Sequence, residues 1–104
     1  MDGKRYKLRI LPLFEDDLNE IADYITYHLK NPSAAERLID DAEAAIHERL
    51  SCAEAFEPYP STKQREYPYY PIHIRNFKIF YVVIGDTMEV RRILYSRRNS
   101  RKLI

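Results

Sequence analysis

The sequence predicts an α+β domain in which an antiparallel pair of helices packs on one face of an antiparallel β-sheet, in the order β-α-α-β-β-β. Two regions with apolar residues at helical spacing follow each other after a short interruption. Near the C-terminus, two β-branched and aromatic runs flank a Gly-Asp turn, which is typical of a β-hairpin. The length of 104 residues fits one domain, residues 1–104, without a second.

The chain is expected to open with an N-terminal strand and to continue into a helix. Polar and apolar residues alternate over residues 6–11, as in a strand, and Pro12 ends this alternation. Over residues 14–29 the apolar residues recur mostly three or four positions apart, which places them in one stripe of a helix. Three carboxylates fill its first turn, where the helix dipole favours negative charge.

A second helix is expected after the interruption at Asn31 and Pro32, and it reaches Leu50. Its start has two competing descriptions. Either Ser33 is the N-cap of a capping box closed by Glu36, or Asn31 is the N-cap with Pro32 in the first turn. Alanines along the apolar stripe would let the two helices approach closely as an antiparallel pair.

A loop and three strands are expected next. Residues 51–64 contain two prolines and no clear period, which predicts a loop. Residues 65–75 are rich in aromatics and prolines before they become strand-like, so an irregular or edge strand is expected there. Residues 77–84 and 88–95 are predicted strands, joined near Gly85.

Composition favours a protein of the cytoplasm. A hydrophobic content of 45% and a charged content of 32% are ordinary for a globular protein. No apolar stretch approaches the roughly 18 residues that span a bilayer, and no signal region follows the start, so no membrane partner is expected. The single cysteine, Cys52, has no partner for an internal disulfide, which favours a reducing compartment.

Charge is distributed unevenly, although the formal net charge is only +1. Residues 1–14 carry four basic side chains and one acidic side chain, whereas residues 15–57 carry three basic and twelve acidic ones. Residues 58–104 carry ten basic and three acidic side chains. The split predicts a molecule with two faces, one of which can meet a polyanion. The alternative is that the split has only structural causes, because helices carry acidic side chains near their starts and strands carry arginines on solvated faces.

Arginines gather around the end of the last predicted strand. A guanidinium group binds phosphate through two parallel hydrogen bonds, so this cluster is a candidate polyanion site. Arg91 and Arg92 should point to opposite faces of one strand, so at least one is expected to be structural. The competing interpretation is a solvated face with salt bridges to the acidic helices. The candidate target- or phosphate-binding residues are Arg92, Arg97, Arg98, Arg75 and Arg65.

His73 and Tyr95 are the candidates for proton transfer. His73 lies on a probable strand with Arg75 expected on the same face, and a histidine near arginines can act as an acid or base near neutral pH. A lone strand histidine is also commonly half-buried or solvated. Tyr95 is either a polar-tipped core residue or a hydrogen-bond donor at the site. His28 and His47 show no ligand spacing, so no metal and no cofactor are expected.

Taken together, several segments resemble the RelE/ParE superfamily of toxins from bacterial type II toxin–antitoxin systems. The resemblance covers nearly the whole chain. It implies a fold of two helices on an antiparallel sheet, and a cognate antitoxin that wraps and neutralises the toxin in a hetero-oligomer. The matching segments are residues 15–18, 21–25, 31–38, 76–81 and 92–99.

The superfamily has two activities. RelE-like members cut messenger RNA, usually in the ribosome and without a metal, and they use basic residues with a Tyr or His near the C-terminus. ParE-like members poison DNA gyrase. By this resemblance, Arg97 matches an arginine shared by much of the family, and His73 lies where RelE-like enzymes carry a catalytic arginine. Residues 101–104 lack the C-terminal Tyr or His, and Tyr95 stands where many ParE-like members have His.

Three functions remain open at this point. The favoured one is a ParE-like plasmid-stabilisation toxin that inhibits gyrase by protein contact, because the helical hairpin and residues 21–25 are closer to that group. The second is a metal-independent, ribosome-dependent mRNA endonuclease, in which His73, Tyr95 and Arg97 would be catalytic. The third is an attenuated relative that keeps only antitoxin binding. Whether the chain is an enzyme therefore stays open.

Overall fold

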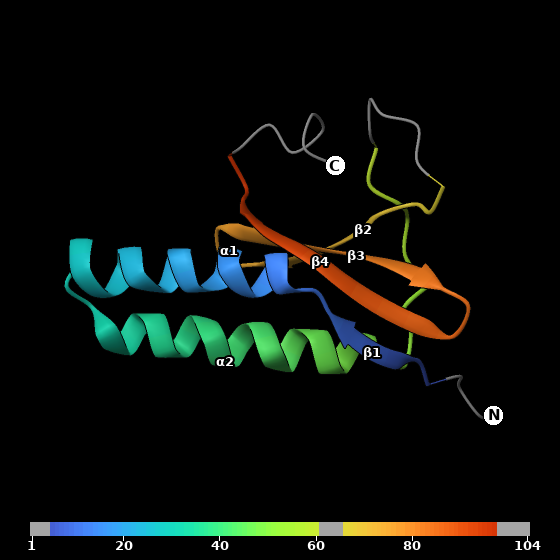
Figure 1. The fold of residues 1–104 in the computed structure, drawn as a ribbon, viewed down its shortest axis with the longest axis horizontal. Coiled ribbons are helices and arrows are strands. Elements are labelled where there is room, and N and C mark those ends of the chain that lie inside the picture. Colours follow the sequence, from blue (N-terminus) through green and yellow to red (C-terminus); the bar gives the residue numbers. More distant parts are fainter. Residues whose placement is uncertain (1–4, 61–65, 98–104) are drawn as a thin grey trace.

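The computed structural model describes residues 5–60 and 66–97. A helical hairpin covers one face of a four-stranded sheet, so the described part forms two layers (Figure 1). This is the predicted α+β class with the order β-α-α-β-β-β. The elements are β1 (Lys7–Ile10), α1 (Pro12–Asp23), the π-helix η1 (Tyr24–His28), α2 (Pro32–Arg49), β2 (Tyr70–Ile74), β3 (Phe77–Ile84) and β4 (Thr87–Tyr95). None of the helices described is both long and apolar enough to cross a membrane.

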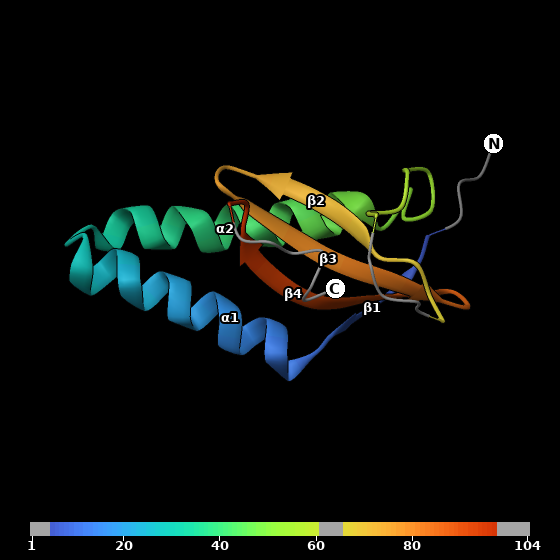
Figure 2. The same cartoon turned by 90° about the horizontal axis from the view of Figure 1, so that it is seen from above.

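The sheet has the strand order β1-β4-β3-β2 (Figure 2). The pairs β2–β3 and β3–β4 are antiparallel, as predicted. β1 instead pairs with β4 in parallel, with Lys7 opposite Thr87 and Ile10 opposite Val90, so the sheet is mixed rather than antiparallel throughout. The chain reverses at the helical turn, before β2 and at two tight turns, and these reversals return β4 to the direction of β1 (Figure 1).

The first helix begins and ends differently from the prediction. Pro12 ends β1 and also opens α1, because a helix needs no N–H at its first position. The last turn widens into the π-helix Tyr24–His28, in which the Leu29 N–H donates to the Tyr24 carbonyl at 3.2 Å. Apolar periodicity did not reveal this widening. Lys30 then adopts a positive φ of 53°, a conformation that often ends a helix.

The start of α2 decides between the two predicted caps. Asn31 is the N-cap, and its side-chain oxygen accepts a hydrogen bond from the Ala34 N–H at 3.2 Å. The Ser33 hydroxyl donates to the same oxygen, so the capping box with Ser33 as cap is wrong. Asn31 with Pro32 in the first turn is correct.

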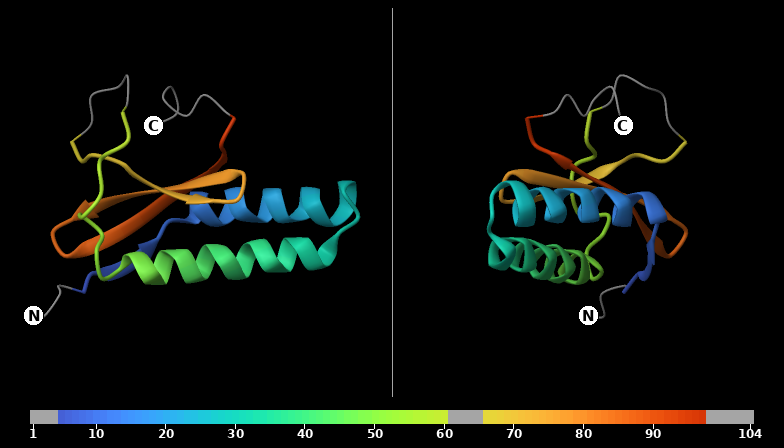
Figure 3. Two further views of the ribbon diagram at one scale, coloured as in Figure 1. Left: turned by 180° about the vertical axis from the view of Figure 1, so that it is seen from behind. Right: turned by 60° about the vertical axis from the view of Figure 1, so that its left-hand side comes forward.

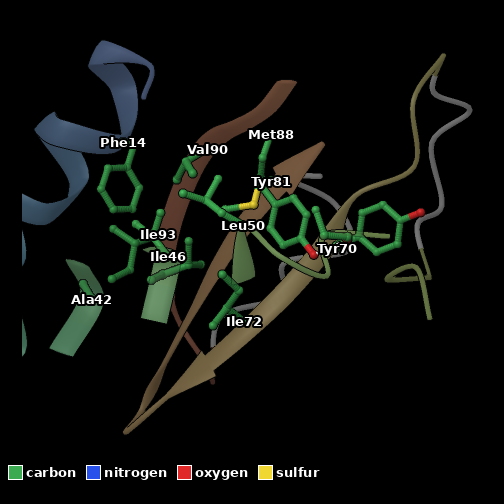
Figure 4. Packing of buried hydrophobic residues seen from close by; sticks show 12 residues of the cluster. Phe14, Ala42, Ile46, Leu50, Tyr70, Ile72, Tyr81, Met88, Val90 and Ile93 are labelled. Carbon is green, nitrogen blue, oxygen red and sulfur yellow. Dashed lines mark hydrogen bonds between the residues drawn. The ribbon is translucent and has the colours of Figure 1, made fainter. Parts of the chain in front are cut away.

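The main core lies between the helical hairpin and the sheet (Figure 4). Ala42 and Ile46 of α2 belong to the same cluster as Tyr81 and Ile93 of the sheet. Tyr81 is completely buried, and its hydroxyl donates to the Ala53 carbonyl at 2.5 Å. A large polar-tipped side chain can be buried in this core because its hydroxyl group has a hydrogen-bond partner.

A smaller cluster covers the face of the sheet away from the helices, which we call the outer face. Tyr69, Phe80, Val82 and Leu94 are buried there. The ring of Tyr59, from the loop after α2, meets Phe80 edge-on at 5.0 Å between centroids. This loop therefore packs onto the outer face of the sheet.

Candidate functional site

The helical hairpin projects past the end of the sheet (Figure 3). A groove lies between the hairpin and this end of the sheet. The volume of the groove is about 600 Å³. One wall is a single face of α1 and η1, and the other wall is formed by the start of β3 and the end of β4. We call it the hairpin groove. It is lined by Asp17, Glu20, Ile21, Tyr24, Ile25, Leu29, Asn76, Phe77, Ile93, Leu94 and Tyr95.

Large apolar side chains are exposed at the hairpin groove. Tyr24 is 55% exposed, Leu29 is 57% exposed and Tyr95 is 43% exposed. The Tyr95 ring rests on Phe77 with 5.5 Å between ring centroids, so the tyrosine is held at the wall rather than buried in the core. Clustered exposed apolar side chains in a groove are typical of a surface that binds another protein.

The predicted proton-transfer residues do not come together. His73 pairs in register with Lys78, and it is exposed on the outer face of the sheet. Tyr95 pairs with Phe77, whose neighbour at alternate spacing, Ile79, belongs to the core beneath the helices. Because side chains alternate between the faces of a strand, His73 and Tyr95 lie on opposite faces of the sheet.

Arg75 does not share a face with His73, so that expectation is wrong. β2 ends at Ile74, and Arg75 turns the chain with a positive φ of 49°. Its guanidinium reaches α2 instead, where Nε and Nη2 donate to the Asp41 carboxylate at 2.9 and 2.5 Å. His73 and Arg75 are separated because β2 ends at Ile74, one residue before its predicted end at Arg75, and the chain turns there.

Arg92 also binds a helix. Its Nε and Nη2 donate to the two Asp17 carboxylate oxygens at 2.7 and 2.9 Å, and the Ile93 N–H donates to the same carboxylate at 3.1 Å. The two side chains are only 22% and 12% exposed. β1 pairs with β4 only as far as Val90. Beyond that point the Asp17 carboxylate accepts the hydrogen bond of the Ile93 N–H at the edge of β4, and this contact fixes α1 to the sheet. The sequence suggested only a dipole role for this carboxylate.

The remaining predicted cations divide into described and undescribed residues. Arg97 is exposed just beyond the end of β4, two residues after Tyr95 at the hairpin groove. Arg65 and Arg98 lie outside the described residues. Within residues 5–60 and 66–97, no three side chains of the metal-binding types gather as ligands would.

A second polar cluster lies on the outer face, where β4 contains a β-bulge. Phe80 pairs with Arg92 and Tyr81 with Val90, so Arg91 is the extra residue. Arg91 donates to Glu89 Oε1 at 2.8 Å and to the Tyr69 hydroxyl at 2.9 Å. Arg91 and Arg92 are therefore both engaged within the fold.

The carboxylate of this outer cluster is almost buried. Glu89 is 6% exposed, and Arg9 donates to its second oxygen at 3.2 Å. Burial alone would raise the pKa of Glu89, but the hydrogen bonds from Arg91 and Arg9 outweigh it, so the pKa is lowered. The ionised carboxylate therefore stabilises the fold.

We expect Glu89→Gln to reduce the acid sensitivity of the fold. Because the folded pKa of Glu89 is lowered, its contribution is complete above the unfolded pKa of 4.5 and disappears as the pH falls through the folded value. The free energy of unfolding, from urea denaturation at pH 7, 4.5 and 3, should fall less steeply with acid in the variant. Glu43→Gln serves as the control, because Glu43 is an exposed residue of α2. An unchanged acid slope for Glu89→Gln would contradict this role.

Comparison with known proteins identifies a family model and a similar solved fold. A family model described as the ParE toxin of type II toxin–antitoxin systems, parDE, matches residues 8–100. A solved structure described as the chromosomal ParDE TA system from P. aeruginosa is similar, with a TM-score of 0.72 and 18% sequence identity. The match covers 89% of this chain and 98% of that chain, and at this identity it supports the fold alone. A search of curated proteins found no match.

Proposed function

This chain belongs to the ParE toxin family of type II toxin–antitoxin systems, and we propose that it inhibits growth by binding DNA gyrase. Family membership makes it a toxin with a cognate antitoxin as its partner. The proposed target is the one that ParE-like members poison. In this proposal the chain acts in the cytoplasm by protein contact, and the antitoxin neutralises it by covering the contact surface.

The hairpin groove is the observation that carries this proposal. Exposed tyrosine side chains supply a large contact area at low entropic cost, and tyrosine is enriched among the residues that dominate binding energies between proteins. An exposed leucine beside them adds apolar contact area. Tyr24 and Leu29 stand on one wall, and Tyr95 stands on the other. A macromolecular partner with an apolar projection would fill this volume and bury all three.

The placement of the candidate catalytic groups also favours protein contact over RNA cleavage. General acid–base chemistry needs its groups within hydrogen-bond reach of one reacting phosphate. His73 and Tyr95 are on opposite faces of the sheet, and Arg92 is occupied by Asp17. Arg97 is exposed two residues after Tyr95, a residue of the groove wall, and in this proposal it makes a rim contact with an acidic patch on the target.

A second candidate function is supported by the outer face. His73 is exposed there and pairs with Lys78. An exposed histidine beside a lysine would suit phosphate chemistry at a messenger RNA, as in RelE-like relatives. Mapping transcripts after induced expression tests this candidate, and intact transcripts in growth-arrested cells would count against it. Normal growth on strong expression without antitoxin would instead indicate an attenuated relative.

Arg97→Ala combined with Arg98→Ala should relieve toxicity while the fold survives. Arg97 is exposed at the end of the sheet beside the hairpin groove, so its loss removes a rim cation without disturbing the core. The measurement is growth after induction without antitoxin, together with the thermal midpoint by circular dichroism. Arg5→Ala with Arg37→Ala removes the same charge at two exposed arginines that do not line the hairpin groove, and it serves as control. Full toxicity of the arginine variant would mean that these arginines have a structural role and do not contribute to toxicity.

A further inference from the structure

The last turn of the first hairpin helix is widened where it meets the hairpin groove. This turn, the π-helix η1, lies at the end of the hairpin that projects past the sheet (Figure 3). Tyr24 and Ile25 of η1 line the groove, and so does Leu29, which directly follows η1. A single widened turn within a helix is frequently found at a functional site.

The widening changes which side chain stands on the groove wall. In an α-helix, the N–H of residue 28 would donate to the Tyr24 carbonyl, four residues before it. Here the Leu29 N–H makes that hydrogen bond, at 3.2 Å. Leu29 therefore takes the place along the helix that residue 28 would otherwise occupy. It lines the hairpin groove, whereas His28 does not.

In a regular α-helix Leu29 would turn away from the groove. Asp17, Ile21, Ile25 and Leu29 line the groove at intervals of four residues. Each such interval rotates a side chain by about 40° in an α-helix, so three intervals would carry Leu29 about 120° around the axis from Asp17. One extra residue in the turn offsets about 100° of this rotation. The π-helix thus keeps an apolar side chain on the wall.

The ring of His28 contacts Tyr24 instead of lining the groove. The two rings stack, with 4.9 Å between their centroids and 27° between their planes. Tyr24 is exposed on the groove wall, and an exposed side chain loses rotamer freedom when a partner binds it. Stacking on His28 restricts the Tyr24 ring in the free chain, so less freedom is lost on binding.

We propose that η1 is the recognition element of the hairpin groove and that His28 is a positioning residue for the partner that binds there. This inference rests on the proposed binding of gyrase. The widened turn places Leu29 on the wall with Tyr24. His28 holds the Tyr24 ring in the orientation that the partner contacts, and it acts through that ring.

Substitutions of His28 test the stacking. His28→Ala should weaken gyrase inhibition about three- to tenfold, because the Tyr24 side chain would then be ordered only on binding. His28→Phe keeps a flat ring against Tyr24 and should restore inhibition to within about twofold of the native chain. His47→Ala is the matched control, because His47 is exposed on α2 and does not line the hairpin groove.

The measurement is the toxin concentration that halves supercoiling by purified gyrase, with circular dichroism as a check on folding. Equal inhibition by His28→Ala and the native chain would overturn the positioning role. So would a His28→Phe variant that inhibits no better than His28→Ala, because stacking would then not be the cause of the loss.

Exchanging the side chains at positions 28 and 29 tests the register of the widened turn. His28→Leu combined with Leu29→His leaves the composition unchanged. In the π-helical register it replaces the leucine of the wall by a histidine and removes the stack on Tyr24, so inhibition should fall at least about tenfold. In an α-helical register the exchange would bring leucine onto the wall. Inhibition as strong as that of the native chain would therefore overturn the proposal.

Nuclear magnetic resonance separates this inference from the proposed function. The ring protons of Tyr24 and His28 should show a nuclear Overhauser contact in the native chain, and His28→Ala should shift the Tyr24 ring resonances more than His47→Ala does. If the native chain inhibits gyrase but lacks this contact, the positioning role is wrong while the proposed function stands. If the contact is present but the chain does not inhibit gyrase, the proposed function fails and His28 still positions Tyr24.

Discussion

Replacing Asp17 with alanine should lower the free energy of unfolding by about 3 kcal/mol, because it removes three hydrogen bonds at one partly buried point. Arg92 would keep its charge at 22% exposure without a partner, and the Ile93 N–H at the edge of β4 would lose its acceptor. Losing one member of a partly buried pair costs more than the pair contributes, since the remaining group stays desolvated. Urea denaturation at neutral pH measures the change.

Asp16→Ala is the matched control, because Asp16 is exposed on the same turn of α1 and its loss should change stability by less than about 0.5 kcal/mol. Combining Asp17→Ala with Arg92→Ala should cost less than the sum of the two single changes, since the two side chains interact directly. A loss for Asp17→Ala no larger than that of the control would show that the pair does not fix α1 to the sheet.

Tyr24→Ala with Leu29→Ala should weaken gyrase inhibition by at least about tenfold, because both side chains are exposed contact area at the hairpin groove. Stability should hardly change, since neither residue belongs to the core. The measurement is the toxin concentration that halves supercoiling by purified gyrase, with circular dichroism as a check on folding.

The chain offers a matched control for this variant. Tyr27 is 73% exposed and Leu13 is 48% exposed, and neither lines the hairpin groove. Leu13→Ala with Tyr27→Ala therefore removes the same side-chain types from other parts of the surface and should leave inhibition unchanged. Equal loss in both double variants would mean that general apolar exposure, rather than the groove, drives inhibition.

Local patterns were sufficient to predict most of the fold. Apolar spacing predicted both helices, and β-branched runs around Gly85 predicted β3 and β4 within one residue of their observed bounds. The parallel pairing of β1 with β4 was missed because the relative direction of two strands depends on how many times the chain reverses between them. The π-helix was missed because widening by one residue leaves the apolar stripe nearly unchanged.

The site was harder to predict because its contacts join distant parts of the chain. Asp17 and Arg92 are 75 residues apart, so no local pattern links them. Arg75 was placed beside His73 by strand alternation, yet the strand ends one residue earlier and the arginine turns to Asp41. The sequence left open whether Tyr95 is a core residue or a site residue. In the structure its side chain is exposed and lines the hairpin groove, because β4 ends there.

Supercoiling by purified DNA gyrase, measured with micromolar amounts of the chain in the presence and absence of its antitoxin, separates the two candidate functions most directly. Gyrase inhibition through the hairpin groove predicts that supercoiling stops when the chain is added. It also predicts that an equimolar amount of antitoxin restores supercoiling. Undisturbed supercoiling in the presence of the chain would contradict it.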